Sequence, residues 1–153
     1  MAKVLKQMTS PEPDRIVGII FPLFEEHIRR FFDEDKTVFV KFIASDLTHI
    51  HSGHRLFFYR SKGNKEVVGE ARIVDIASKT ANEALATYGD RLFLTAKELR
   101  EYVRDRNAKN MLVLVLDHFK KYPVPLRLDK SVTMAGQYMR QSLLSQLRNA
   151  PQI

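Results

Sequence analysis

Three histidines lie close together in the sequence and are the first candidates for chemistry: His49, His51 and His54. Alternate residues of an extended segment point to the same side, so two of them could bind one metal ion with the third as a further ligand. A site of this kind needs an additional ligand, and the interval between them contains only Ser52 and Gly53. We therefore predict no metal and no cofactor, and keep the histidines as alternative ligands beside the simpler interpretation that they are loop residues.

A lysine within an apolar strand is the second candidate. Lys41 alternates with Phe39 and Ile43 in the run KTVFVKFI. Burial of an unpaired ammonium group is costly, so Lys41 must reach solvent, pair with a carboxylate or face a cleft. A lysine that faces a cleft is available to bind an anion such as a phosphate.

Aromatic, basic and hydroxyl side chains follow one another at the end of the next predicted strand, as Tyr59, Arg60, Ser61 and Lys62. Cations neutralise phosphates, aromatic rings stack on bases, and hydroxyls reach the 2′-OH of RNA. The simpler interpretation is that the charges are solvated hairpin residues and that the aromatic ring belongs to the core. The pattern predicts an RNA-binding groove that also contains Lys41.

A second group with similar chemistry lies towards the C-terminus. Arg127 could hold a phosphate, whereas Gln137 and Tyr138 could hydrogen-bond to a base and stack on it. The alternative is a C-terminal helix that packs over the domain with its charges outward. The helical stripe also offers a homodimer contact, and it consists of Met139, Leu143, Leu144 and Leu147.

The charge of the chain is concentrated in two blocks. Its 25 Lys and Arg against 18 Asp and Glu give a net charge of +7. Residues 36–65 carry six basic groups and one acidic group, and residues 106–153 carry eight and two. A basic surface often indicates a polyanionic partner, here RNA, if the two blocks share one face.

The composition also excludes several classes of protein. The 153 residues contain no cysteine, which rules out disulfides, thiol nucleophiles and cysteine-based zinc sites. No apolar run is long enough to span a bilayer, and the N-terminus does not resemble a signal peptide. We therefore expect a cytoplasmic protein with no membrane partner.

The elements that would position these residues are mostly strands. Residues 1–13 are predicted to be an extended or disordered arm, and residues 14–153 a single domain with a C-terminal helix. Apolar and β-branched runs predict strands at 15–21, 36–43, 55–61, 66–76 and 111–116, with an edge strand at 124–128. Periodic patterns predict helices at 23–32, 79–88, from residue 95 onwards and at 134–147.

Three local features are expected within these elements. The helix at 23–32 should carry ion pairs of Glu25 with Arg29 and of Glu26 with Arg30, and Pro22 should lie at its first turn. A glycine inside the fourth strand, Gly69, suggests a bulge or a close backbone approach. The spacing of Thr95 and Glu98 is that of a capping box at a helix start.

Several segments taken in order resemble the PUA-like superfamily, especially its ASCH and EVE branches. They are the strand at 36–41, SGHRLFFYRS at 52–61 and VGEARI at 68–73. The chain is also similar to an uncharacterised archaeal family of that superfamily, in YGDRLFLT at 88–95 and GQY at 136–138. The resemblance implies an α+β fold: a mixed, mainly antiparallel PUA-like pseudobarrel of five or six strands with covering helices. It implies RNA binding or modified-base recognition as the function.

Some ASCH-like domains resemble amidohydrolases of acylated nucleosides that use a Lys, a Thr and a Glu. Here Lys36 matches the family lysine, Thr37 lies beside it, and Glu70 could supply the carboxylate. The expected hydroxyl position holds Phe39, which breaks the constellation. The resemblance therefore implies a binding protein, with an ASCH-type hydrolase as the alternative.

Base recognition in EVE relatives often uses an aromatic cage that contains Trp. This chain has no Trp, so a cage would use Phe21, Tyr59 or Tyr138. The sequence predicts an RNA-binding or modified-nucleotide-recognition protein. A small amidohydrolase and a protein-interaction module built on the C-terminal helix stay open as alternatives.

Overall fold

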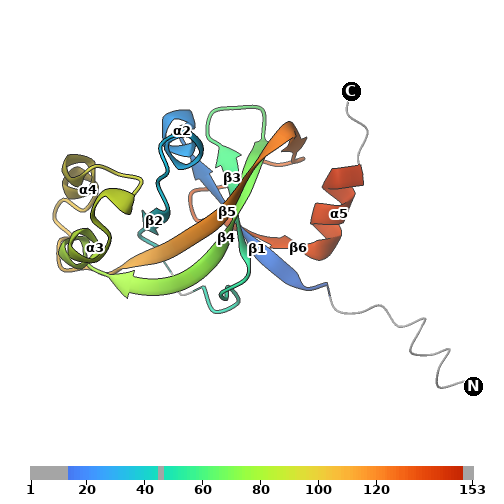
Figure 1. Cartoon of the computed structure of the whole chain (residues 1–153). Helices are drawn as coiled ribbons and strands as arrows, with labels where there is room; N and C mark the ends of the chain where they lie inside the picture. The colour runs from blue at the N-terminus through green and yellow to red at the C-terminus, as the bar shows by residue number, and fades with distance from the viewer. Residues whose placement is uncertain (1–13, 45–46, 150–153) are drawn as a thin grey trace, which may run out of the picture.

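The computed structural model describes residues 14–44 and 47–149, so the predicted arm at 1–13 lies outside the described residues (Figure 1). The strands are β1 (Ile16–Leu23), β2 (Val38–Lys41), β3 (Arg55–Arg60), β4 (Glu66–Lys79), β5 (Met111–Arg127) and β6 (Gln137–Arg140). The helices are α2 (Glu25–Asp33), α3 (Ala81–Tyr88), α4 (Ala96–Tyr102) and α5 (Gln141–Asn149), with a 3₁₀ turn η1 (Gly89–Arg91).

The strands form one mixed sheet in the order β2-β5-β4-β3-β1-β6. β1 and β3 are parallel, and every other neighbouring pair is antiparallel. The long strands β4 and β5 sweep across the molecule and curve the sheet (Figure 1). The α+β prediction of a mixed, mainly antiparallel sheet of five or six strands with covering helices is confirmed, although the end strands β2 and β6 do not pair with each other to close a barrel.

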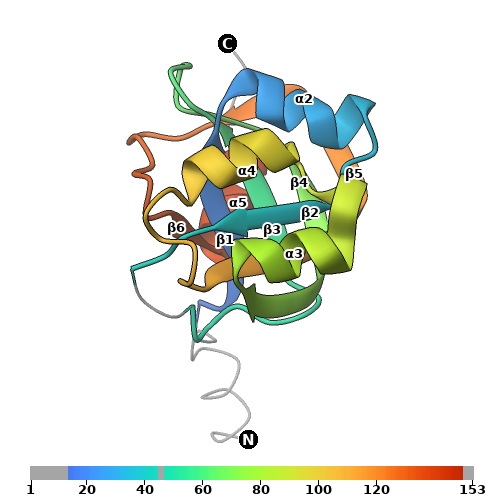
Figure 2. The same cartoon turned by 90° about the vertical axis from the view of Figure 1, so that its left-hand side faces the viewer.

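Both faces of the sheet are buried. In β3, Phe57 and Tyr59 pack into one core cluster and Phe58 packs into the other. The larger cluster lies on the side of β2, where Figure 2 shows α2, α3 and α4 around that strand. The smaller cluster is covered by α5, which buries Leu144 and Leu147. The C-terminal apolar stripe is therefore used within the chain.

Strand β5 is longer than the sequence pattern predicts. It continues through the segment 117–122 and the expected edge strand at 124–128, and it pairs with β4 as far as Arg127. Between the pairs Val67–Leu126 and Gly69–Lys121, β5 carries a bulge that contains both of its prolines. A proline lacks a backbone N–H, and in a bulge it costs no ladder hydrogen bond. The prediction of a separate edge strand was therefore wrong.

The predicted helix at 134–147 divides into β6 and α5. Residues 137–140 instead pair with β1, and the helix begins only at Gln141. Gly136 has a φ of 83°, and a Cβ there would lie 2.5 Å from the ring of Phe21. The close approach of this turn to β1 brings β6 against the sheet edge, where strand hydrogen bonds replace helical ones.

The predicted ion pairs within α2 do not form. Arg30 pairs with Glu98 instead, and Glu25 pairs with Arg60 at 2.7 Å. Pro22 lies in β1, and the helix begins at Glu25. Tertiary partners outcompete the neighbours along the helix because partly buried ion pairs are stronger than solvated ones.

The expectations for Gly69 and for the capping box are confirmed. The pairing register shifts on both sides of β4 near Gly69, and a Cβ there would lie 2.7 Å from the carbonyl oxygen of Lys120. Thr95 and Glu98 form the capping box of α4. Thr80 and Glu83 form a second capping box, at the start of α3.

Candidate functional site

A pocket of about 370 Å³ lies where the end of β1, the start of α2, β2 and α4 meet. This volume falls within the range of small-ligand sites. Its walls are mostly apolar and aromatic. The lining residues are Pro22, Leu23, Phe24, His27, Phe39, Val40, Lys41, Ser61, Lys62, Phe93, Leu94, Tyr102 and Met134.

Stacked aromatic rings form the inner wall. The rings of Phe39 and Phe93 lie 5.4 Å apart and nearly parallel, and Phe21 stacks on the other side of Phe39, also at 5.4 Å. His27 meets Phe93 edge-on at 5.3 Å. Because these rings come from β1, β2, α2 and the segment before α4, the pocket exists only when the four parts are assembled.

Lys41 is the cation of this pocket and is the last residue of β2. Its side chain is half-buried, and burial lowers the pKa of its ammonium group. Its Nζ atom lies 5.5 Å from the centre of the Phe21 ring, and within the described residues no carboxylate pairs with it. A desolvated cation without a counter-ion favours an anionic or carbonyl-bearing ligand.

The mouth of the pocket has exposed apolar edges. Phe24 is 53% exposed and Met134 is 64% exposed, and both line the pocket. The Nζ atom of Lys62 lies 5.7 Å from the centre of the Phe24 ring. Burial, followed by the nearby Arg30 charge, lowers the pKa of His27, which favours a neutral imidazole in the wall at neutral pH.

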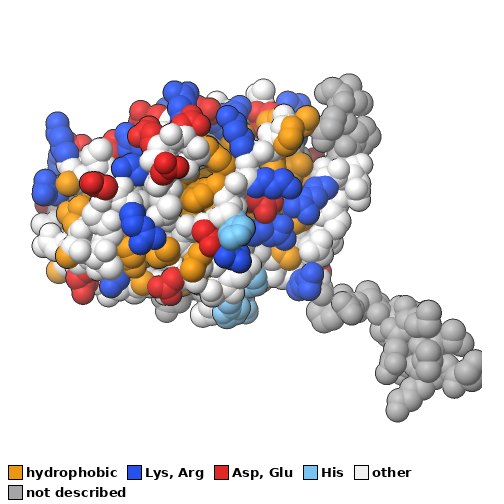
Figure 3. Space-filling view, viewed as in Figure 1, with side chains coloured by type: hydrophobic (Ala, Val, Ile, Leu, Met, Phe, Trp, Pro, Cys, Tyr) orange, Lys and Arg blue, Asp and Glu red, His pale blue; other side chains and the backbone are white. Residues whose placement is uncertain are grey.

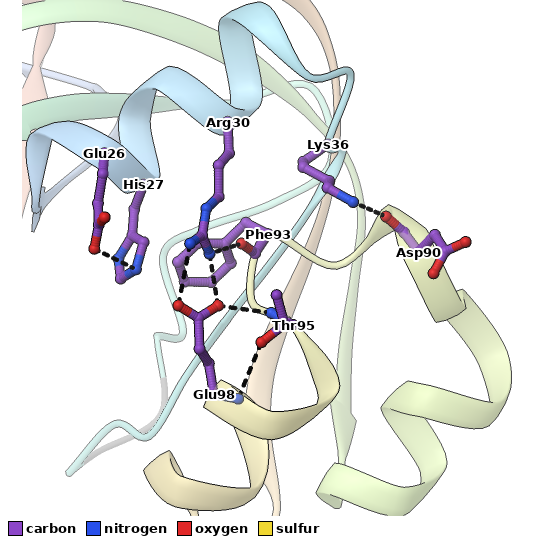
Figure 4. A network of polar contacts seen from close by, with 8 residues as sticks. All are labelled: Glu26, His27, Arg30, Lys36, Asp90, Phe93, Thr95 and Glu98. Atoms are coloured by element: carbon purple, nitrogen blue, oxygen red, sulfur yellow. Dashed lines mark hydrogen bonds and ion pairs between the residues drawn. The ribbon is translucent and has the colours of Figure 1, made fainter.

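A polar network beneath the pocket holds its wall (Figure 4). Arg30 donates to both carboxylate oxygens of Glu98 and to the carbonyl oxygen of Phe93. Glu98 also accepts a hydrogen bond from the backbone N–H of Thr95 at 2.8 Å. These contacts tie α4 and the segment that carries Phe93 to α2.

Three of the predicted nucleic-acid-binding residues meet in this pocket, namely Lys41, Ser61 and Lys62. Arg60 points away from it and pairs with Glu25 and Glu66. Tyr59 is only 5% exposed and packs in the smaller core cluster, so it is not available to stack on a base. Tyr59 and Phe58 are neighbours in β3 and point to opposite faces of the sheet. Both rings are buried because each of these faces is covered by a core cluster.

The C-terminal candidates lie elsewhere. Arg127 lines a separate polar hollow with Lys65, and Gln137 is exposed on β6. Tyr138 packs against the larger core cluster and meets His49 edge-on at 5.8 Å. Of the proposed cage residues, Phe21 is fully buried beneath Lys41. The pocket beside Lys41 therefore contains none of Arg127, Gln137 and Tyr138.

The hydrolase candidates are held by different partners. Lys36 donates to the carbonyl oxygen of Asp90, and the hydroxyl of Thr37 accepts from Arg91. Glu70 instead accepts hydrogen bonds from Tyr122 and Arg148, and it pairs with Arg55.

The three candidate histidines do not form one cluster, although the rings of His51 and His54 lie 5.5 Å apart. His49 lies against Tyr138, whereas Nδ1 of His54 accepts a hydrogen bond from the backbone N–H of His51 at 3.0 Å. Within residues 14–44 and 47–149, no group of three His, Asp or Glu side chains is placed to hold a metal ion.

The two basic blocks of the sequence do meet in space. Arg55 from the first block and Arg148 from the second both pair with Glu70. Figure 3 shows Lys and Arg side chains gathered over the part of the sheet next to α5. Arg55 and Arg148 are paired with a carboxylate there, whereas Lys41 has no such partner among the described residues.

Ten of the lining residues were not predicted as site residues from the sequence, among them Phe24, Phe93, Tyr102 and Met134. The signal for Phe24 is its place immediately before α2, four residues ahead of the buried Ile28. The other three lie at helix ends or in loops, and their local sequence carries no such signal.

The arrangement of the sheet and its covering helices matches the fold of solved ASCH structures. The structure of ASCH from Zymomonas mobilis matches with a TM-score of 0.72 and 18% identity, covering 86% of this chain and 94% of that one. A point mutant of the same protein matches with a TM-score of 0.74 and 19% identity, covering 88% and 96%. This likeness shows the shared fold.

The chain belongs to the DUF365 family, a domain of unknown function, whose family model matches residues 16–141. It is 25% identical over 103 residues to the uncharacterized protein MJECS03 of Methanocaldococcus jannaschii, covering 61% of this chain and 95% of that protein. The chain is thus similar to an uncharacterised archaeal protein, which is the coarser part of the expected resemblance. Among the described helices, none has the length and apolar character that crossing a membrane requires.

Proposed function

We propose that this protein binds single-stranded RNA or a modified nucleotide, with one base inserted in the pocket beside Lys41. The observation that carries the proposal is a half-buried lysine at the wall of an otherwise aromatic and apolar pocket. Bases in single-stranded RNA are free to leave the stack and to insert between aromatic side chains.

The shape and chemistry of the walls support a flat ligand. Phe39 and Phe93 stack upon one another and present apolar surface, and Phe24 adds an exposed ring at the mouth. A stacked base gains about 1–3 kcal/mol from each aromatic contact of this kind. An aliphatic ligand would gain from burial alone and would leave the polar groups of the pocket without partners.

The cations support an acidic or carbonyl-bearing ligand. Lys41 lies inside the pocket and Lys62 lies at its mouth, so one can contact a base carbonyl or a phosphate and the other the backbone that continues outside. A ligand that carries the counter-charge repays the desolvation of Lys41. The hydroxyls of Ser61 and Tyr102 supply further hydrogen-bonding groups in the wall.

The hydrolase alternative is not the basis of this proposal, because Lys36, Thr37 and Glu70 are occupied by separate partners. The interaction-module alternative is likewise not carried further. Leu144 and Leu147 are buried against the chain's own sheet, so the stripe of α5 is not a free apolar surface.

The test is fluorescence anisotropy with labelled single-stranded RNA between 50 and 200 mM salt. We expect affinity to fall steeply with salt, and Lys41→Met to weaken binding about tenfold or more, the scale of one charge-assisted contact. Lys97→Met, at an exposed site outside the pocket, is the matched control. Absence of binding at low salt, or equal affinity for the two variants, would overturn the proposal.

A further inference from the structure

A stack of aromatic and cationic side chains begins where the pocket ends. We call it the flanking stack, and it consists of Tyr102, Phe42, Arg106 and Lys109. Tyr102 lines the pocket and its ring lies 5.2 Å from that of Phe42, almost parallel. The guanidinium of Arg106 lies 4.0 Å from the centre of the Phe42 ring, and Nζ of Lys109 lies 5.7 Å from it.

The stack is held in place by hydrogen bonds. The backbone N–H of Phe42 donates to the hydroxyl of Tyr102 at 2.9 Å. Arg106 donates through Nη2 to the carbonyl oxygen of Tyr102 at 3.0 Å. The planar guanidinium is therefore held over the ring before any ligand arrives, which reduces the entropy lost on binding.

The charge of the flanking stack has no acidic partner among the described residues. The exposed Arg72 pairs with Asp117 and the exposed Arg148 with Glu70, so the charges of these two arginines are compensated. Arg106 and Lys109 are exposed and form no such ion pair within the described part of the chain. Two uncompensated cations beside an aromatic pair favour an anionic ligand that also has a flat face.

We propose that the flanking stack is a second nucleotide subsite, which binds the nucleotide next to the one in the pocket. The second base stacks on the outer face of the Arg106 guanidinium, and Arg106 and Lys109 hold the linking phosphate. This inference rests on the proposed function. It also gives the RNA strand a path, because Lys62, Phe24 and Tyr102 all line the pocket and the flanking stack begins at Tyr102.

The test measures the affinities of a mononucleotide and of single-stranded oligo-A, oligo-C and oligo-U octanucleotides. Each competes with a labelled RNA for the protein. Arg106→Ala should weaken octanucleotide binding about tenfold and reduce the salt slope by about one, while mononucleotide binding stays unchanged. Arg106→Lys should keep the salt slope but lose affinity, because the charge stays and the planar face is lost. Arg104→Ala, an exposed neighbour outside the stack, is the control.

Lys109→Gln guards against a folding defect in the arginine variant, since its side chain contributes only the contact with Phe42 among those described for it. We expect unchanged melting and a salt slope smaller by about one. If Lys41→Met weakens octanucleotide binding while Arg106→Ala and Lys109→Gln do not, the second subsite is wrong and the pocket proposal stands. If no RNA binds to the unaltered protein, the pocket proposal and the second subsite are both wrong. If DNA octanucleotides bind with the same affinity and the same response to the variants, the subsite recognises single strands of RNA and DNA alike.

Discussion

The Arg30 guanidinium on α2 and the Glu98 carboxylate on α4 form a bidentate ion pair, with N–O distances of 2.6 and 3.1 Å. The same carboxylate completes the capping box with Thr95, and the same guanidinium donates to the carbonyl oxygen of Phe93 at 2.9 Å. Arg30 and Glu98 are 68 positions apart in the sequence. Their contacts hold the start of α4, and the segment of the pocket wall that carries Phe93, against α2.

The stability that this pair provides should depend on pH. Hydrogen bonds from Arg30 and then from Thr95 lower the pKa of Glu98 from its usual 4.5 to about 2. Because the folded chain holds this proton more weakly than the unfolded chain, the contribution is complete above about pH 4.5 and is lost as the pH falls towards 2. We expect Glu98→Gln to lower Tm at pH 7, and the difference from the unaltered protein to vanish near pH 2, measured by circular dichroism.

Glutamine suits the third position of a capping box, so Glu98→Gln isolates the loss of charge opposite Arg30. Glu101→Gln, at an exposed position on the same helix, is the control and should change Tm little at any pH. A difference between Glu98→Gln and the unaltered protein that persists unchanged down to pH 2 would contradict the assignment.

Replacement of Lys41 should stabilise the folded chain while it weakens RNA binding. Burial lowers the pKa of Lys41 from its usual 10.5, so the charged form is costly in the folded state. Lys41→Met should raise Tm, by about 2–4 °C for each kcal/mol relieved in a chain of this size. The gain should be greatest at neutral pH and should shrink as the pH approaches 10.5, because the folded protein then releases the proton first.

Lys97→Met again serves as the control for a lost surface charge. A fall in Tm when Lys41 is replaced would show that this lysine stabilises the folded chain. It would contradict the argument that its partly buried charge destabilises the protein in the absence of a ligand.

The exposed ring at the pocket mouth should matter for binding and little for folding. Phe24 is 53% exposed, so Phe24→Ser removes little buried surface but takes away one stacking face. We expect RNA affinity to fall about 5- to 100-fold, the scale of one base–aromatic contact, with little change in Tm. Val74→Ser is the matched control, because Val74 is 42% exposed and lies on β4 outside the pocket. Equal affinities for the two variants would remove Phe24 from the site.

The bulge in β4 should not accept a side chain. A Cβ at residue 69 would lie 2.7 Å from the backbone oxygen of Lys120 and 2.7 Å from the ring of Phe32. Gly69→Ala should therefore cost about 1–3 kcal/mol of unfolding free energy, measured by urea denaturation. Gly63→Ala is the control, since its nearest neighbour is the flexible side chain of Arg60 at 3.0 Å. Equal midpoints for the two variants would contradict the close approach.

Local sequence signals located most elements of the fold. The strand at 55–61 and the capping box of Thr95 and Glu98 follow from residues close together in the chain, and the structure confirms both. The family resemblance implied the mixed, mainly antiparallel sheet with covering helices, which the structure also confirms. The errors at the C-terminus and in β5 arose where a distant strand offered hydrogen bonds, because pairing with β1 or β4 outweighs local helix propensity and proline breaks.

For the site, the sequence by itself identified Lys41 as a cation out of place in an apolar strand, since an ammonium group there must face something other than the core. Only the tertiary structure decided what it faces. Phe24, Phe93 and Tyr102 come from segments far apart along the chain, and they line one pocket because α2 and α4 are held together by Arg30 and Glu98. The partners of a partly buried charge are chosen by packing in three dimensions, which the spacing of residues along the chain does not encode.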